Sequence, residues 1–345
     1  MRKKFWLIFF VVIFCSDANV FYGNEKRLTW LFGNPDTLYL ESINHTLGLK
    51  LYYANKYSTF DIMGNNFDKR LQYVANSDNS IGIGVIYSFL DVNFGYSRNF
   101  FGSSERGNSK KFDFQTQMYL PTTTWRIFIN KYKGFYLHNA DDIIANWHNS
   151  DDYYIRDDIE AYSVRASVNY FFNHSQYSNK ILFAHQALQK KTAGSFLVGL
   201  SLDFSGVSSD SSFVPSAITD TSLFNLNVDR SSYWSVGVTG GYAINFAIRN
   251  HWFIGGMLAP GLSFARNNQA AGNVEQTDNS LNIYLQTEFG FGYNSRRLYA
   301  GLHRKQDLMR TPIGNEHNSL SLRNGKVYLM VVYRFKVRSI FNMFD

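Results

Sequence analysis

The sequence predicts an all-β protein, a transmembrane antiparallel up-and-down β-barrel of about twelve strands behind a cleaved N-terminal signal peptide. Apolar residues alternate with polar or small residues in many segments, which is the pattern of strands with different environments on their two faces. Aromatic residues make up 17% of the chain, which suits girdles at two lipid–water interfaces. The connections alternate between long and short, as short turns at one end of a barrel and long loops at the other require.

The first element in chain order is a secretory signal over residues 1–18. Three basic residues precede an apolar run from Phe5 to Cys15, and small residues follow at the positions that a signal peptidase reads. The run is too short to cross a hydrocarbon core of about 30 Å as a helix. We expect cleavage after Ala18, which removes the chain's one cysteine and with it disulfides, thiol catalysis and Cys-based zinc sites.

The mature chain is expected to begin with a periplasmic segment over 19–45, to form the barrel over 46–335, and to end in a tail over 336–345. We interpret 179–204 as one interrupted strand, because this gives an even number of strands with both termini in the periplasm. The predicted strands cover residues 47–53, 81–89, 92–96, 112–120, 125–129, 162–170, 179–204, 234–246, 252–264, 281–293, 298–302 and 326–335.

The closing strand, from Lys326 to Phe335, shows the alternation most clearly. One of its faces is wholly apolar, and it ends on an aromatic residue. In 234–247 and 281–294, Gly and small polar residues repeat on one side only, which indicates a lumen face where small residues relieve crowding.

Alternation also places a mixed set of charges on the inward face. These side chains either line a permeation path or pair to brace a closed interior, and the sequence leaves both open. For Lys190 and Lys191 we favour a bent strand with both amines in interfacial water over a kink that turns one toward Glu288 or an anionic solute. The inward charges are Lys50, Asp113, Arg126, Arg165, Asp203, Glu288 and Arg334, and the candidates for lumen or ligand contact are Lys50, Asp113, Arg126, Arg165, Lys190, Lys191 and Glu288.

Six segments carry a family resemblance: residues 36–40 (DTLYL), 56–57 (KY), 153–157 (YYIRD), 189–196 (QKKTAGSF), 210–215 (DSSFVP) and 333–335 (YRF). Together they resemble an uncharacterised Bacteroidetes-type family of outer-membrane barrels, domain of unknown function 4421, over nearly the whole mature chain. The chain departs from the family at Asp157-Asp158, where Pro-Asp is common, and in the tail after Phe335. The family has no assigned activity, so the resemblance implies location and shape only.

Several functional classes are disfavoured by the sequence. It holds no G-x-S-x-G, H-E-x-x-H, Walker or C-x-x-C motif, which favours a protein without enzymatic activity, and we expect no cofactor and no bound metal. His138 and His148 stand among aspartates in one loop, but their irregular spacing favours a solvated acidic loop over a cation site. The net charge of +7 is too small and too scattered to predict nucleic-acid binding.

The leading functional hypothesis is a channel or small-ligand uptake barrel in the outer membrane of a Gram-negative cell. The alternatives are a membrane-embedded hydrolase of lipid or lipopolysaccharide and a structural or assembly barrel with a filled lumen. Expected partners are outer-membrane lipid and lipopolysaccharide, the barrel-assembly machinery and a small solute, with no nucleic acid. We expect residues 205–231 to form a mobile extracellular loop.

Overall fold

The architecture is seen in a computed structural model of the chain. The expected signal peptide, and all of the expected tail except Lys336 and Val337, lie outside the residues that the structure describes. Those residues are 34–43, 46–64, 70–76, 79–87, 90–97, 104–148, 152–183, 187–218, 227–314 and 318–337.

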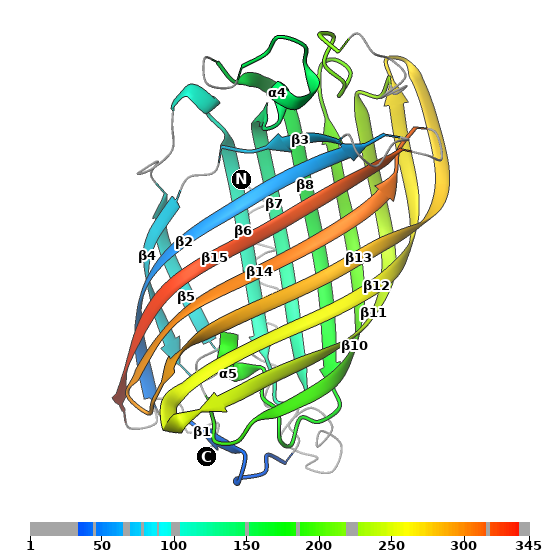
Figure 1. Cartoon of the computed structure of the whole chain (residues 1–345). Helices are drawn as coiled ribbons and strands as arrows, with labels where there is room; N and C mark the ends of the chain where they lie inside the picture. The colour runs from blue at the N-terminus through cyan, green and yellow to red at the C-terminus, as the bar shows by residue number, and fades with distance from the viewer. Residues whose placement is uncertain are drawn as a thin grey trace, which may run out of the picture.

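An antiparallel sheet closes on itself and forms the wall of the molecule (Figure 1). Within the described residues, ten strands make a closed ring, because the last strand pairs with β2 in register from Ser319↔Met63 to Lys336↔Thr46. The predicted all-β antiparallel barrel is therefore confirmed. The ring consists of β2 (Thr46–Met63), β3 (Arg70–Val74), β7 (Thr123–Leu137), β8 (Tyr154–Phe171), β10 (Ala193–Ser208), β11 (Arg230–Ile248), β12 (Trp252–Ala271), β13 (Val274–Asn294), β14 (Leu298–Pro312) and β15 (Ser319–Lys336).

Three further strands belong to the wall: β4 (Asn79–Tyr87), β5 (Leu90–Ser97) and β6 (Lys110–Tyr119). The short strand β3 pairs only with the upper end of β2 and with the upper end of β7. The rest of β2 pairs with β4, which carries β5, while β6 pairs with β7. The described sheet thus contains thirteen strands, ten of them in the closed ring, where the sequence predicts a barrel of about twelve.

The two faces of the wall differ as the alternation predicts. On β11, Val238 is 59% exposed on the outside while the neighbouring Thr239 is 7% exposed on the inside. On β15, Val331 and Tyr333 face outward, and Val332 and Arg334 are buried inside. An apolar outer surface with a polar interior is what a lipid-embedded barrel requires.

Most strands extend beyond their predicted ends at the upper side of the barrel, in the orientation of Figure 1. Residues 265–280, which lie between two predicted strands, are themselves largely strand. Here β12 and β13 form a long hairpin whose turn is Gly272-Asn273, with Gly272 at a φ of 60°. The outward-facing residues there are polar, for example Asn55 and Tyr57 on β2. The outward-facing residues therefore stop being apolar before the strands stop pairing.

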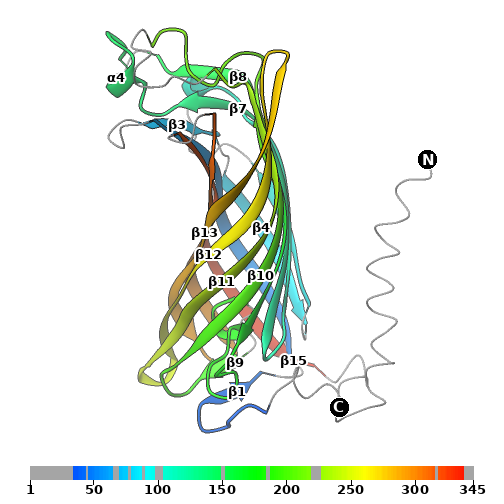
Figure 2. The same cartoon turned by 90° about the vertical axis from the view of Figure 1, so that its right-hand side faces the viewer.

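The interpretation of 179–204 as one interrupted strand is wrong. Residues Lys180–Phe183 form a helical turn, α5, followed by the short strand β9 (Ala187–Gln189), and only then does β10 begin. Strand β9 pairs not with the wall but with β1 (Leu40–Ser42), forming a separate two-stranded sheet. Both views place this sheet at the lower end of the barrel (Figures 1 and 2). None of the helices within the described ranges is long and apolar enough to cross a membrane.

Candidate functional site

The upper end of the lumen is filled by an apolar group of side chains that we call the upper cluster. Phe60 of β2 stacks on Tyr73 of β3, with ring centroids 4.7 Å apart, and meets Phe135 of β7 edge to face at 5.3 Å. Segments above the wall add to it, namely α4 (Ala140–Ile143) and the loop that holds Phe213. The buried members are Phe60, Ile62, Leu71, Tyr73, Ala75, Tyr132, Phe135, Leu137, Ala140, Ile144, Ile159, Ala161, Val207, Phe213, Ile218, Val228, Tyr233, Tyr284, Met309, Ile313, Leu320 and Leu322.

The loop after β10 is fastened over this cluster by Arg156 of β8. The Arg156 guanidinium donates to the carbonyl oxygen of Ser212 at 3.0 Å and pairs with Asp158 at 2.8 Å. Asp158 in turn accepts the backbone N–H of Asp210 at 3.1 Å, and the Arg156 hydrogen bond holds the pKa of Asp158 below its ordinary value. The described part of 205–231 (205–218 and 227–231) is thus packed against the cluster, and the mobility of the loop stays a prediction.

Residues 177–183 and 187–189 fill the lower end of the lumen, and we call them the lower plug. Ile181 and Ala187 pack in one cluster with inward-facing side chains of the wall such as Phe253 and Tyr299. Inward-facing asparagines also bind the backbone of the lower plug. Asn245 donates to the carbonyl oxygen of Ser178 and Asn294 to that of Ala187, each at 2.9 Å. Figure 1 shows α5 inside the outline of the barrel.

Hydrogen bonds and an ion pair hold β1 beneath the lower plug. The backbone N–H of Lys190 donates to the carbonyl oxygen of Tyr39 at 2.8 Å, and the Lys190 ammonium donates to that of Thr37 at 3.0 Å. Glu41 pairs with Arg296 at 2.6 Å, and this hydrogen bond lowers the pKa of Glu41. Segments 36–40 and 189–196, both of which carry the family resemblance, therefore meet here, as 153–157 and 210–215 meet at the upper end.

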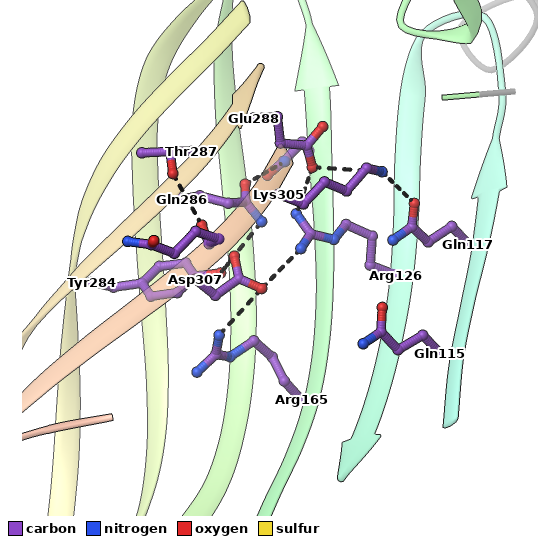
Figure 3. Close-up of polar contacts among 12 residues, drawn as sticks. Gln115, Gln117, Arg126, Arg165, Tyr284, Gln286, Thr287, Glu288, Lys305 and Asp307 are labelled. Carbon is purple, nitrogen blue, oxygen red and sulfur yellow. Dashed lines mark hydrogen bonds and ion pairs between the residues drawn. The ribbon is translucent and has the colours of Figure 1, made fainter. Parts of the chain in front are cut away.

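Between the two ends lies a set of charged, mostly buried side chains, which we call the ionic layer. Figure 3 shows Arg126, Arg165, Glu288, Lys305 and Asp307 of this layer. Arg126 of β7 reaches across the lumen to two carboxylates, pairing with Glu288 of β13 at 3.0 Å and with Asp307 of β14 at 2.8 Å. Asp307 also accepts the Tyr284 hydroxyl at 3.1 Å. Because Arg126 and these carboxylates come from opposite sides of the ring, their pairing braces the wall across its interior. The members of the layer are Lys56, Asp113, Arg126, Arg165, Asp203, Glu288, Lys305, Asp307 and Lys326.

Arg165 gives the ionic layer a second buried centre. Arg165 and Asp203 are opposite each other on β8 and β10 and form an ion pair, and the Arg165 guanidinium lies 4.8 Å from the centre of the Tyr284 ring. Ser205 donates to the other Asp203 oxygen at 2.5 Å. Buried ions need partners for their remaining donors and acceptors. Arg165 Nη1 has no hydrogen-bond partner among the described residues, and its nearby carboxylate is Asp307, 3.5 Å away.

Lysines occupy three adjacent strands in one row. Lys305 of β14 is opposite Lys326 of β15, which is opposite Lys56 of β2. Lys305 lies beside Glu288 at 3.9 Å and donates to Gln117 and Tyr119 at 2.8 Å, while Lys56 pairs with Asp113. A cavity of about 20 Å³ lies against Lys326 and Lys305. This volume holds about one water molecule.

The predicted site residues divide into two groups. Five of them, Lys50, Asp113, Arg126, Arg165 and Glu288, face the lumen, and all but Lys50 belong to the ionic layer. Asp203 and Arg334, also predicted inward, are buried inside the barrel. Lys190 and Lys191 instead lie at the lower end, against Thr37, Glu41 and the Tyr39 ring, and the described partners of Glu288 are Arg126 and Lys305.

Sequence reasoning missed four members of the ionic layer: Lys56, Lys305, Asp307 and Lys326. The first three lie in stretches that we had placed beyond the strand ends. Continuing the two-residue alternation past Leu302 would have placed Lys305 and Asp307 on the same face as Tyr299. Lys326 stands on the inward face of the predicted closing strand but was not counted among the inward charges.

An apolar exterior, a closed antiparallel ring and a polar interior define an integral β-barrel membrane protein of the outer-membrane type. The family described as domain of unknown function (DUF4421) matches residues 34–335, so the chain belongs to this family. No curated protein matches the chain.

Solved structures of similar architecture include three from Gram-negative bacteria. The outer membrane protease OmpT from Escherichia coli has 8% sequence identity and a TM-score of 0.39, covering 86% of this chain and 98% of its own. The translocator domain of the autotransporter NalP from Neisseria meningitidis has 9% identity and a TM-score of 0.32, covering 93% and 98%. The toluene transporter TodX from P. putida has 8% identity and a TM-score of 0.22, covering 89% and 94%.

Proposed function

We propose that the protein is a closed, non-conducting barrel of the Gram-negative outer membrane, with a structural or assembly role. The observation that carries this proposal is the filling of the lumen at three successive levels. The upper cluster and the ionic layer join side chains from opposite sides of the wall, and the lower plug packs against inward-facing side chains of the wall. This arrangement favours the filled-lumen alternative over the channel.

Energetics support the same conclusion. A water-filled pore would hydrate its charged side chains, whereas Arg165 and Asp203 are 4% exposed and Glu288 and Asp307 are 7% exposed. Buried pairs of this kind hold the elements that carry them in one arrangement, because separating the partners leaves uncompensated charges in a poorly hydrated interior. The ionic layer thus fixes the cross-section of the barrel.

The barrel would be surrounded by outer-membrane lipid and lipopolysaccharide and would be inserted by the barrel-assembly machinery. Its upper end, fastened by Arg156, would then be presented to the cell exterior. Nothing in the described part of the chain favours the hydrolase alternative.

Conductance across a planar bilayer tests the proposal. The folded mature protein should give no current steps above those of the bare bilayer, with heat-modifiable gel mobility as the control for folding. A matched variant, in which 177–189 is replaced by a Gly/Ser stretch of equal length, should also give no current, because the upper cluster and the ionic layer still fill the lumen. Sustained ion-selective conductance of the wild type would contradict the proposal and restore the channel.

A further inference from the structure

The ionic layer has one positive charge too many. Its cations are Lys56, Arg126, Arg165, Lys305 and Lys326, and its anions are Asp113, Asp203, Glu288 and Asp307. Each cation except Lys326 has a carboxylate within 4 Å. The excess charge can therefore be assigned to a single side chain.

Lys326 is buried, with 8% of its surface exposed, and its ammonium has no hydrogen-bond or ion-pair partner among the described residues. The Lys326 ammonium lies over the Tyr328 ring, 4.7 Å from the ring centroid. On both neighbouring strands the residue directly opposite is another lysine, Lys305 or Lys56. Like charges directly opposite each other destabilise a sheet, and a buried charge without a counterion is costly.

The cavity beside Lys326 presents hydrogen-bond donors. Gln117 lines the cavity, and its side-chain oxygen accepts a hydrogen bond from the Lys305 ammonium. An ammonium can only donate, so this bond leaves the amide nitrogen of Gln117 available as a donor. Asn324 also lines it, and its side-chain oxygen accepts from Asn130 at 2.8 Å, which leaves its amide nitrogen. Asp307 contributes the one carboxylate of the lining, and it is already paired with Arg126.

We propose that this cavity is a binding site for one small inorganic anion of halide size, such as chloride, held by the Lys326 ammonium and by the Gln117 and Asn324 amides. The volume of about 20 Å³ suits a group of about the size of one water molecule, so a monatomic anion fits it better than a carboxylate or a phosphate ester. The anion neutralises the excess charge and separates the three lysines. It acts as a structural counterion, so the site does not depend on whether the barrel conducts.

Thermal unfolding of the folded full-length mature protein in detergent tests the site, with chloride exchanged for gluconate at constant ionic strength. A ligand that binds only the folded state raises the unfolding midpoint as its concentration rises. The midpoint should climb with chloride in the wild type, and K326M should abolish that dependence. K50M is the matched control, because Lys50 is also an inward, buried lysine but does not line the cavity, and it should keep the wild-type dependence.

A second variant supplies the counterion from the chain itself. N324D places a carboxylate on the lining beside Lys326, so its unfolding midpoint should not change with chloride. In gluconate, the N324D midpoint should be at least as high as the wild-type midpoint. Crystals soaked in bromide should show an anomalous peak at Lys326 in the wild type and none in N324D. Equal wild-type midpoints in the two salts and no bromide peak would overturn the proposal, leaving a cavity that holds only water. Retention of the chloride dependence by K326M would also overturn it.

Discussion

Arg126 is the residue on which the interior of the barrel depends most directly, because it joins Glu288 and Asp307 across the lumen. Replacement of Arg126 by Met keeps much of its volume but leaves both buried carboxylates short of a partner. We expect a loss of about 3 kcal/mol or more in the free energy of unfolding. Urea unfolding in micelles, followed by tryptophan fluorescence, measures this loss.

The matched control is Lys131→Met on the same strand. Lys131 pairs with Glu160 at 2.7 Å, but its side chain is 55% exposed, so its loss should cost less than about 1 kcal/mol. If the two variants lost equal stability, the ion pairs of the lumen would be as well hydrated as those of the surface.

At the scale of the element, β11 contains two adjacent glycines in opposite environments. A Cβ atom on Gly241 would lie 2.2 Å from the carbonyl oxygen of Leu258 and 2.6 Å from the Cα of Ala259, whereas a Cβ on Gly240 would meet nothing within 4 Å. Gly241→Ala should therefore destabilise the barrel by about 1–3 kcal/mol through overpacking. Gly240→Ala should change stability by less than about 0.5 kcal/mol.

The same urea unfolding experiment compares the two glycine variants. The expected order depends on Gly241 facing a closely approaching neighbouring strand and Gly240 facing open space outside. A larger loss for Gly240→Ala would mean that the facing of β11 is reversed.

The wall could be predicted from the sequence because lipid on one side and polar side chains on the other impose a two-residue period. That period identified the closing strand and the inward faces of β11 and β13. It failed at Asn55 and Tyr57, where the outward residues become polar while the backbone pairing continues. The lower plug was missed for a different reason. Residues 180–183 and 187–189 pack against parts of the wall distant in sequence, and no local period encodes such contacts.

At the scale of the whole molecule, the direction of insertion can be measured with single cysteines, since the mature chain is expected to have none. Asn273 lies at the tip of the β12–β13 hairpin at one end, and Arg297 lies in the turn between β13 and β14 at the other. On intact cells a membrane-impermeant maleimide should label Asn273→Cys, and should label Arg297→Cys only after lysis. The opposite pattern would invert the proposed topology.

The pairing of β15 with β2 also determines how the molecule must assemble. It joins the two strands of the wall that are most distant in sequence, so it carries the largest loop-closure entropy and belongs to the slow class of folding steps. The lower plug is continuous with β8 on one side and β10 on the other, so it has no free end to thread into a finished ring. It must be enclosed while the ring closes, and a folding intermediate that still lacks the β15–β2 pairing therefore already carries the segment that will fill it.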